Sequence, residues 1–399
     1  MLLTLTMLLQ EKESRLSSVY CSSCLQTYDH RTVFTFATCC GKPLLVGYDL
    51  REMPARTILK DRPHTMWRYR EFLPVFADEN IVSLGEGFTP ITDLSGLAGE
   101  FGFSQVRVKD EAFNPTASFK ARGLSMAVSK AKEFGIKACV IPTAGNAGGA
   151  LAAYCARAGM EATVVMPAWT PAIFVQDCRI FNAKVILVDG LINECGKLAA
   201  EISRNTGAFD ISTLKEPYRI EGKKTMGFEI AEQYNWKLPD VIIYPAGGGT
   251  GLIGIWKAFR EMHQAGWISG NFPRMVAVQS ANCQPVVKQY DDLKGQVNHY
   301  SSPKPSLANG LAVPTPFGLD LMLEVIRESN GCAVAVTESD IVAGVRFLAQ
   351  REGLLLSPEG AATWQAMIQL KRSHFLKGDE NILLLNTGSG YKYLDNLGD

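Results

Sequence analysis

The most reactive side chain in the segment of residues 114–123, which reads Asn-Pro-Thr-Ala-Ser-Phe-Lys-Ala-Arg-Gly, is that of Lys120. A strand-like run at 105–109 leads into the segment and a helix-like run at 118–134 leads out of it. Ser118 stands where an N-cap would stand, which places Lys120 in the first helical turn. A cation there opposes the helix macrodipole, so this amine loses its proton more readily than an ordinary lysine. Because a neutral lysine amine attacks aldehydes, the segment predicts a covalent aldehyde-binding residue, with a surface lysine as the alternative.

The elements that must position this lysine alternate between strand-like and helix-like patterns. Apolar runs predict strands at 105–109, 138–142, 162–167, 183–188, 241–245, 275–279 and 381–385. Helical periodicity predicts helices at 118–134, 146–159 and 221–234. It also predicts a helix between 167 and 183, one that ends at about 205 and one that ends at about 263. Apolar strands separated by helices indicate an α/β fold with mostly parallel sheets covered on both faces.

Three glycine-rich turns follow predicted strands, at residues 143–149, 247–251 and 386–390. Ligands bind at the carboxyl ends of strands in open α/β sheets, so these turns are candidate binding loops. The second turn has few side chains and opens a helix, which suits a phosphate group; its residues are Gly247, Gly248, Gly249, Thr250 and Gly251. Its spacing differs from the nucleotide-binding glycine motifs, and a plain tight turn is the alternative for each loop taken alone.

Composition limits the classes of function. The chain has 399 residues, of which 47% are hydrophobic and 20% are charged, which suits two associated α/β domains. Lys plus Arg and Asp plus Glu number 40 each, so net charge gives no reason to expect nucleic acid or a membrane as partner. The apolar residues 1–9 lack a basic n-region and a cleavage site and are too short to span a bilayer. We therefore expect a cytoplasmic protein.

The ten cysteines fall into two groups. Six are scattered singly in core-like runs, which is typical of reduced, buried cysteine. The other four lie near the N-terminus as Cys21-x-x-Cys24 and the adjacent pair Cys39-Cys40. Two such knuckles are able to hold a zinc ion, but adjacent cysteines do not easily turn both thiolates to one metal. The sequence therefore favours a metal-free β-hairpin in which none of these cysteines binds a metal, and a zinc site is the alternative.

The segment around Lys120 resembles the cofactor-lysine motif of the pyridoxal-phosphate enzymes with the tryptophan-synthase-β fold. Within that group the chain is similar to the threonine synthases, on the motifs at residues 67–70, 83–90 and 218–225 and on the cysteine-bearing segment that ends Tyr48-Asp49. The resemblance covers nearly the whole chain. It implies fold type II, with two α/β domains, mostly parallel sheets and the cofactor in the cleft between them.

The resemblance also implies a domain organisation. Residues 1–55 form a cysteine-containing appendage and residues 56–399 form the catalytic region. A smaller α/β subdomain at about 125–215 is inserted in the larger domain. Related enzymes imply a homodimer.

By the same resemblance, four parts of the chain hold pyridoxal 5′-phosphate. Lys120 binds the cofactor covalently and serves as the catalytic base. Asn146 bonds the cofactor's 3′-oxygen, the turn at 247–251 holds its phosphate, and Thr387 meets its pyridine nitrogen. A hydroxyl partner does not keep that nitrogen protonated, which favours elimination and replacement chemistry.

The implied substrate is O-phospho-L-homoserine, which a threonine synthase converts with water to L-threonine and phosphate. The leaving phosphate needs a fixed cation, and Arg219 is the first candidate because a guanidinium grips phosphate bidentately. The alternative for Arg219 is a surface ion pair with Glu216 or Glu221. Ser212 and Thr143 are further candidates for substrate contacts.

Some residues depart from the threonine synthase pattern. Residues 143–147 read Thr-Ala-Gly-Asn-Ala where threonine synthases commonly read Ser-Thr-Gly-Asn-Thr, and Ala121 stands where many have Asp. The turn at 247–251 is closer to that of the threonine and serine dehydratases. A dehydratase, or a β-replacement synthase acting on a serine-type or phosphoserine-type substrate, is therefore the alternative enzyme. A catalytically silent relative that binds amino acids or a partner is the alternative of another class.

Overall fold

The computed structural model describes residues 14–397, and the apolar segment 1–9 lies outside them. The chain divides into two compact units. Unit 1 comprises Met1–Phe88, Lys120–Phe228 and Lys257–Ile268, and unit 2 comprises Thr89–Phe119, Glu229–Trp256 and Ser269–Asp399. The division predicted from the resemblance, at 1–55 and 56–399 with an insert at about 125–215, stays a prediction.

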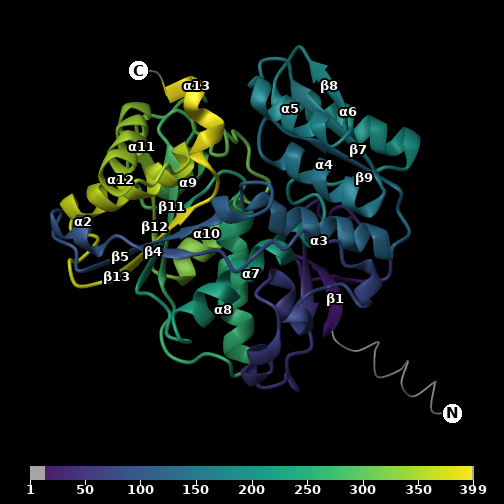
Figure 1. Ribbon diagram of the computed structural model, residues 1–399, viewed down its shortest axis with the longest axis horizontal. Helices are drawn as coiled ribbons and strands as arrows, with labels where there is room; N and C mark the ends of the chain where they lie inside the picture. The colour runs from purple at the N-terminus through teal and green to yellow at the C-terminus, as the bar shows by residue number, and fades with distance from the viewer. Residues whose placement is uncertain (1–13, 398–399) are drawn as a thin grey trace. The chain divides into compact units, whose positions relative to one another are not determined.

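The larger sheet of unit 1 has four parallel strands in the order β8-β7-β6-β9 (Figure 1). Their bounds are Lys184–Val188, Glu161–Pro167, Ala138–Pro142 and Phe209–Asp210. The helices that follow along the chain are α4 (Ala147–Ala158), α5 (Ala172–Ile180) and α6 (Ile192–Thr206). Buried side chains of β6, β7 and α6 form one core cluster, which includes Val140, Val165 and Ala199. These strands and helices lie where the alternating sequence pattern predicts them.

Two further helices of unit 1 meet at a pair of glycines. They are α3 (Lys120–Glu133) and the first part of α7 (Tyr218–Gln233). A Cβ atom on Gly222 would lie 2.1 Å from the carbonyl oxygen of Arg122, and one on Gly123 would lie 3.1 Å from that of Arg219. The first turns of α3 and α7 therefore approach each other more closely than any larger residue would allow. The helix α8 (Thr250–Gln264) begins in unit 2 and ends in unit 1.

A small antiparallel sheet in unit 1 has the strand order β2-β1-β3. Its strands are Thr27–Tyr28, Leu16–Cys21 and Leu44–Tyr48. Cys21 ends β1, and the turns beside the strands carry Cys24, Cys39 and Cys40; the four thiol sulfurs all lie within 4.8 Å of one another. Adjacent cysteines were expected not to turn both thiolates easily to one metal, but the turn at 38–40 directs the sulfurs of Cys39 and Cys40 to one point.

The rest of the described part of unit 1 consists of short 3-10 helices and loops. The helices are η1 (Arg56–Asp61), η2 (Met66–Phe72) and η3 (Asp78–Asn80). The loop after them holds Glu86, which is fully buried and accepts hydrogen bonds from Trp67 Nε1 (2.8 Å), Ser125 Oγ (2.6 Å) and Tyr154 Oη (2.7 Å). Because Ser125 belongs to α3 and Tyr154 to α4, one carboxylate joins the loop to both helices.

Unit 2 is built on a six-stranded sheet in the order β12-β11-β10-β13-β5-β4. The bounds are Cys332–Val336, Arg274–Ser280, Val241–Pro245, Asn381–Asn386, Gln105–Asp110 and Ile91–Asp93. All neighbouring pairs are parallel except β4 with β5. This agrees with the mostly parallel sheets that the sequence predicts.

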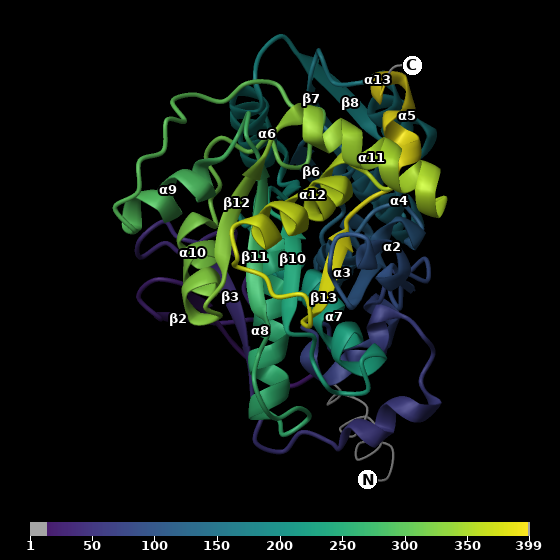
Figure 2. The same ribbon diagram turned by 90° about the vertical axis from the view of Figure 1, so that its left-hand side faces the viewer.

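Helices cover this sheet. Their bounds are α2 (Ser95–Gly99), η4 (Glu111–Phe113), α9 (Pro285–Leu293), α10 (Leu319–Glu328), α11 (Glu338–Glu352), α12 (Pro358–Arg372), η5 (Gly390–Tyr393) and α13 (Leu394–Leu397). Figure 2 shows α12 crossing the strands, and it packs against β10, β11, β12 and β13. Its Trp364 is fully buried in a core cluster with residues such as Ile243 and Leu384. Neither β12 nor the helices between 319 and 372 were predicted from the sequence.

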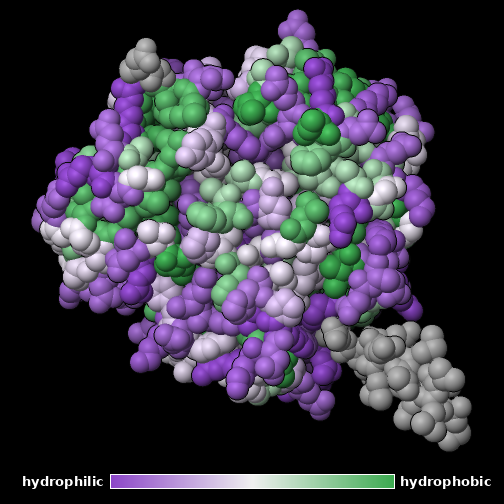
Figure 3. Space-filling view, viewed as in Figure 1, coloured by the Kyte–Doolittle hydropathy of each residue, from purple (hydrophilic) through white to green (hydrophobic). Residues whose placement is uncertain are grey.

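Hydrophilic residues cover much of the face shown in Figure 3, and hydrophobic residues form scattered groups between them. Within the described residues, no helix combines the length and the apolar composition needed to cross a lipid bilayer.

Candidate functional site

Lys120 is the first residue of α3 and is partly exposed. The helix begins two residues later than predicted, because the backbone of Ser118 pairs with Gly388 in an isolated antiparallel bridge. The expected first-turn position of Lys120 is confirmed, which puts this residue at the positive end of the helix macrodipole. This placement favours the neutral amine.

The residues just before Lys120 belong to unit 2 and are fixed by its last loop. The backbone N–H of Phe119 donates to the carbonyl oxygen of Thr387 (3.0 Å), and that of Ser389 donates to Ala117 (3.0 Å). Ala117 has a φ of 55°, a left-handed conformation that costs a residue with a Cβ about 1–2 kcal/mol. The two loops thus hold a strained turn directly ahead of the lysine.

Thr387 follows β13 immediately and is 6% exposed. Its neighbour Asn386 is fixed by bonds from its Nδ2 to Asp110 Oδ1 (2.6 Å) and from the backbone N–H of Ser357 to its Oδ1 (3.2 Å). The position of Thr387 is therefore set by packing at the ends of β13 and β5.

The glycine turn at 247–251 lies between β10 and α8, at the carboxyl end of a central strand of unit 2. A Cβ on Gly247 would lie 2.0 Å from the Gly310 carbonyl oxygen. A Cβ on Gly249 would lie 2.4 Å from Met322 Sδ, and one on Gly251 would lie 1.9 Å from Tyr244 Oη. Gly249 also has a φ of 80°. Only glycine fits these three positions, so the bare backbone of the turn is enforced by its neighbours, and Thr250 then begins α8.

Tyr244 is a residue that the sequence analysis assigned only to a strand. Its ring is buried and contacts the ring of Phe119 edge to face, with 6.4 Å between the centroids. Its hydroxyl, which lies against Gly251, is buried and has no hydrogen-bond partner among the described residues. Such a group costs free energy unless a ligand or water satisfies it. Tyr244 thus joins the glycine turn to the residue before Lys120, and a tyrosine within an apolar run was the only indication in the sequence.

In unit 1, Asn146 occupies the N-cap position of α4, as the sequence predicts for a helix that begins near 146. Its side chain makes no capping bond, although asparagine is a favoured N-cap residue. Its Oδ1 is buried without a hydrogen-bond partner among the described residues. The carboxamide is therefore available to a ligand instead of to its own helix.

Arg219 lies in the first turn of α7 and is 2% exposed, so it is not the surface ion pair considered as its alternative. Its Nη1 donates to the Ile211 carbonyl (2.8 Å) and to Thr213 Oγ1 (3.4 Å). Its Nε is buried without a hydrogen-bond partner within the described chain. Burial lowers the pKa of this guanidinium, while the nearby Glu216 opposes that shift.

The first turns of α3 and α7 place Arg219 next to the helix that carries Lys120. The Cβ of Arg219 lies 3.4 Å from the position of a Cβ on Gly123. Gly123 follows Lys120 by three residues, and residues with that spacing share one face of a helix. Unit 1 therefore packs the backbone and Cβ of Arg219 against the face of α3 on which Lys120 lies, and the guanidinium extends from there to Ile211 and Thr213.

The two hydroxyl candidates are less available. The hydroxyl of Ser212 donates to Asp210 Oδ1, so its proton is already committed. Thr143 is half-buried, follows β6 directly and accepts a bond from the Gly145 backbone N–H (3.2 Å). Both residues lie in unit 1 with Lys120, Asn146 and Arg219, whereas the glycine turn and Thr387 lie in unit 2.

Glu216 precedes α7 and gives the region a dependence on pH. It is fully buried, and its Oε2 accepts bonds from the backbone N–H groups of Tyr218 (2.7 Å) and Arg219 (3.0 Å). Burial raises the pKa of this carboxyl from 4.5 to about 7, against the lowering effect of Arg219. Below the ordinary pKa of 4.5, which applies to the unfolded chain, the carboxyl holds its proton in both the folded and the unfolded state. As the pH rises from there toward 7, only the folded state keeps the proton, so unfolding releases it and the folded state loses stability.

We expect Glu216→Gln to remove this loss. The variant should gain stability relative to the wild type as pH rises from about 4.5 to 7, by at most about 3 kcal/mol. Urea unfolding monitored at several pH values measures the difference, and the exposed Glu201→Gln in α6 is the control. An advantage of Glu216→Gln that is the same at every pH would contradict the raised pKa.

The donor groups described above fit pyridoxal phosphate. Asn146 presents a buried carboxamide oxygen without a partner among the described residues, and the turn at 247–251 is a cradle that a Cβ at Gly247, Gly249 or Gly251 would fill. The lone hydroxyl of Tyr244 beside that cradle is a further donor for an anion. Thr387 offers a hydroxyl, as the resemblance requires. The fit concerns the chemical nature of these groups, and the assignment of each residue to one part of the cofactor stays a prediction.

Comparisons with known proteins identify relatives over most of the chain. The family model described as "Pyridoxal-phosphate dependent enzyme" matches residues 82–388. A threonine synthase of Methanocaldococcus jannaschii is 33% identical over 377 residues, which cover 93% of this chain and 92% of the relative. A threonine synthase of Methanosarcina acetivorans is 32% identical over 370 residues, or 92% of this chain and 90% of the relative.

Among solved structures, maize serine racemase superimposes with a TM-score of 0.63 at 22% identity, over 75% of this chain and 89% of its own. At that identity the likeness concerns the fold alone. It agrees with the predicted fold type II.

Proposed function

This chain belongs to the pyridoxal-phosphate dependent enzymes and, among them, to the threonine synthases, and we propose that it converts O-phospho-L-homoserine and water to L-threonine and phosphate. It is thus a lyase whose cofactor is pyridoxal 5′-phosphate. The observation that supports the phosphate-ester substrate most is the buried Arg219, with its unsatisfied Nε, beside the helix that begins at Lys120. A dehydratase that acts on threonine or serine has no leaving phosphate and no need of that cation.

We propose that Lys120 holds the cofactor and moves protons. When bound, the cofactor withdraws electrons from the substrate, so that protons at Cα and Cβ become acidic. As a neutral amine, Lys120 removes the proton at Cα, and as the resulting ammonium it carries protons toward Cβ and Cγ. Its place in the first turn of α3 supports this role, because the macrodipole favours the uncharged amine.

Other residues hold the cofactor in this proposal. Asn146 binds its 3′-oxygen through the carboxamide, and Thr387 meets its pyridine nitrogen through the hydroxyl. The backbone N–H groups of residues 247–251 and the start of α8 bind its phosphate, since helix N-termini and successive amides attract anions. The hydroxyl of Tyr244 is placed to donate to the same phosphate.

Arg219 binds the phosphate that leaves from Cγ. A guanidinium offers several donors in one plane, and its attraction for the anion is strong because the side chain is shielded from water. Thr143 and Ser212 are the proposed hydroxyl contacts to the substrate. The substrate carboxylate lies at the start of α4, where the helix dipole favours negative charge.

Product analysis tests the substrate. Purified protein is supplied with O-phospho-L-homoserine, L-threonine or L-serine in separate reactions, and threonine, phosphate and 2-oxo acids are measured. We expect threonine and phosphate in equal amounts from O-phospho-L-homoserine, with little 2-oxo acid from any substrate. 2-Oxobutanoate from threonine at a higher rate would assign the chain to the dehydratases instead, and no product from any of them would favour a silent relative.

We also propose that the protein acts as a homodimer in the cytoplasm on a small-molecule amino-acid substrate. The scattered cysteines support a reducing compartment, because thiols persist there. Light scattering of the purified protein measures the oligomeric state.

A further inference from the structure

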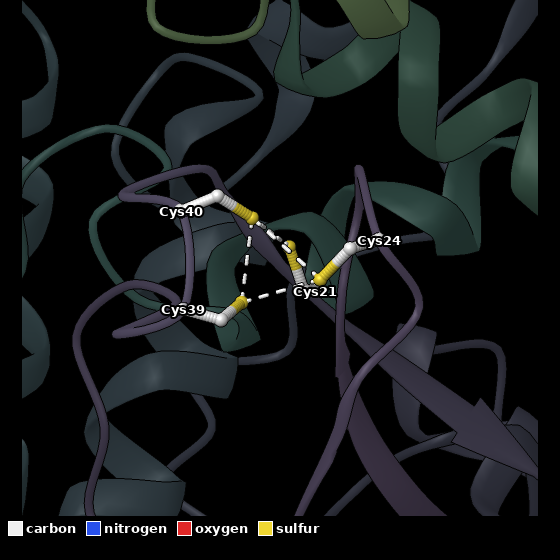
Figure 4. A group of neighbouring side chains, drawn as sticks. All are labelled: Cys21, Cys24, Cys39 and Cys40. Carbon is white, nitrogen blue, oxygen red and sulfur yellow. Dashed lines mark hydrogen bonds between the residues drawn. The ribbon is translucent and has the colours of Figure 1, made fainter.

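The four cysteines of the small sheet form a second site, outside the region that the family model matches. Figure 4 shows their sulfur atoms converging from two turns. Cys21 Sγ lies 3.3 Å from Cys40 Sγ, Cys24 Sγ lies 3.3 Å from Cys39 Sγ, and the sulfurs of Cys39 and Cys40 are 3.3 Å apart. The sulfurs of Cys24 and Cys40 are 3.6 Å apart. No disulfide joins any of them.

This arrangement matches the ligand shell of a tetrahedral metal ion. Four sulfurs bound at about 2.3 Å from a zinc ion are separated from one another by about 3.8 Å. All six separations here fall within 4.8 Å, so each sulfur neighbours the three others. A site designed for disulfides would bring sulfurs together in pairs, at about 2.05 Å within each pair.

The two turns that supply the cysteines have the same backbone bonds. In the first, Cys21 N–H donates to the Gln26 carbonyl (2.9 Å) and Leu25 N–H donates to the Cys21 carbonyl (3.1 Å). In the second turn, sixteen residues later, Ala37 N–H donates to the Lys42 carbonyl (2.9 Å) and Gly41 N–H donates to the Ala37 carbonyl (2.8 Å).

The two turns also share their backbone conformation. Leu25 and Gly41, at the same place in each turn, both have a φ of 62°. The repeat indicates two copies of one metal-binding knuckle.

The repeat also explains the adjacent cysteines. Cys24 and Cys40 occupy the same position in the two turns, and so do Cys21 and Ala37. The second turn therefore lacks a thiol at its first position. Cys39 supplies the missing sulfur from two residues further along. In the first turn the Ser23 N–H donates to Cys21 Sγ (3.4 Å), whereas the equivalent Cys39 N–H donates to Tyr28 Oη (3.1 Å).

We propose that Cys21, Cys24, Cys39 and Cys40 bind one zinc ion and that this ion stabilises the small sheet. Four thiolates around zinc leave no coordination position open, which is typical of structural and not of catalytic zinc. The core cluster beside the cysteines is small, with Val19, Cys21, Ala37 and Leu44 as its buried members, and a core of that size needs an additional constraint. The ion supplies the constraint.

The sheet is connected to the helices of unit 1 through Tyr48, the last residue of β3. Its hydroxyl donates to Glu221 Oε2 (2.7 Å), and the ammonium of Lys224 lies 4.0 Å from its ring centroid. Glu221 and Lys224 are fully buried in α7, where Lys224 also pairs with Glu261 of α8 (2.8 Å). Loss of the ion should therefore loosen the packing of Tyr48 on a buried charge cluster and lower the stability of unit 1.

The zinc content of the full-length protein tests the proposal. The protein is purified without an affinity metal and analysed by elemental mass spectrometry, where we expect about one zinc per chain. Cys24→Ser and Cys40→Ser should each reduce zinc to a small fraction and lower the melting temperature. Cys195→Ala in α6, which removes a buried cysteine far along the chain, should retain the zinc.

A rescue variant separates ligand loss from general misfolding. The double variant Ala37→Cys with Cys39→Ser moves the thiol to the position that the repeat predicts, and it should bind zinc where Cys39→Ser alone does not. Cobalt exchanged into the wild type should give the visible ligand-field bands of a tetrahedral thiolate site. Zinc-free wild-type protein with four titratable thiols, iron in place of zinc, or a disulfide among the four cysteines would each overturn the assignment.

Discussion

Replacing Lys120 by alanine is expected to reduce the rate of threonine formation by roughly a thousandfold or more, because the variant loses both the covalent attachment of the cofactor and the catalytic base. The visible absorption of the cofactor-bound protein should disappear or shift to that of free cofactor. Absorption spectra and threonine production, measured on the same preparation, check both effects.

The control lies on the same helix. Lys132 is exposed near the end of α3, and its Nζ donates to the backbone carbonyl of Glu79. Lys132→Ala should keep the absorption and the rate. If Lys120→Ala retained its covalent cofactor, another lysine would hold it, and the assignment made from the 114–123 segment would be wrong.

Replacing Arg219 by glutamine is expected to lower turnover of O-phospho-L-homoserine by about 100- to 1000-fold, which is the loss seen when one preorganised charge stabiliser is removed. The cofactor absorption should remain, because Arg219 is assigned to the substrate's phosphate and not to the cofactor. Glutamine removes the charge and keeps an amide donor near the position of Arg219 Nε. Steady-state kinetics and the absorption spectrum of the variant measure the two properties separately.

Two further variants define the role of the guanidinium. Arg219→Lys keeps the charge but loses bidentate binding, so its rate should fall between those of the wild type and Arg219→Gln. Arg204→Gln, at an exposed position in the last turn of α6, should behave as the wild type. Normal turnover by Arg219→Gln would show that the leaving phosphate is held elsewhere.

Much of the fold could be predicted because the parallel strands are buried on both faces. The run that became β10, for example, consists of five buried residues, and apolar runs of that kind are distinctive. Its predicted bounds, 241–245, are those observed. The strand β12 was missed although its five residues are all apolar, because two of them are alanines, which have a low strand propensity.

Individual contacts at the site were harder to predict than the elements. The position of Lys120 followed from its motif, but the burial of Arg219 depends on the glycine pair Gly123 and Gly222, which lie far apart in the sequence. The role of Glu86 as a common acceptor for two helices likewise depends on long-range packing. The zinc alternative was disfavoured because sequence spacing alone does not reveal that the turn at 38–40 directs both sulfurs inward.

The central claim is that Lys120 holds pyridoxal phosphate covalently, and chemical trapping tests it most directly. The cofactor-loaded protein is reduced with borohydride and digested, and its peptides are analysed by mass spectrometry. We expect the mass of one reduced cofactor on the peptide that contains Lys120. A modified peptide with a different lysine, or protein that takes up no cofactor, would contradict the account.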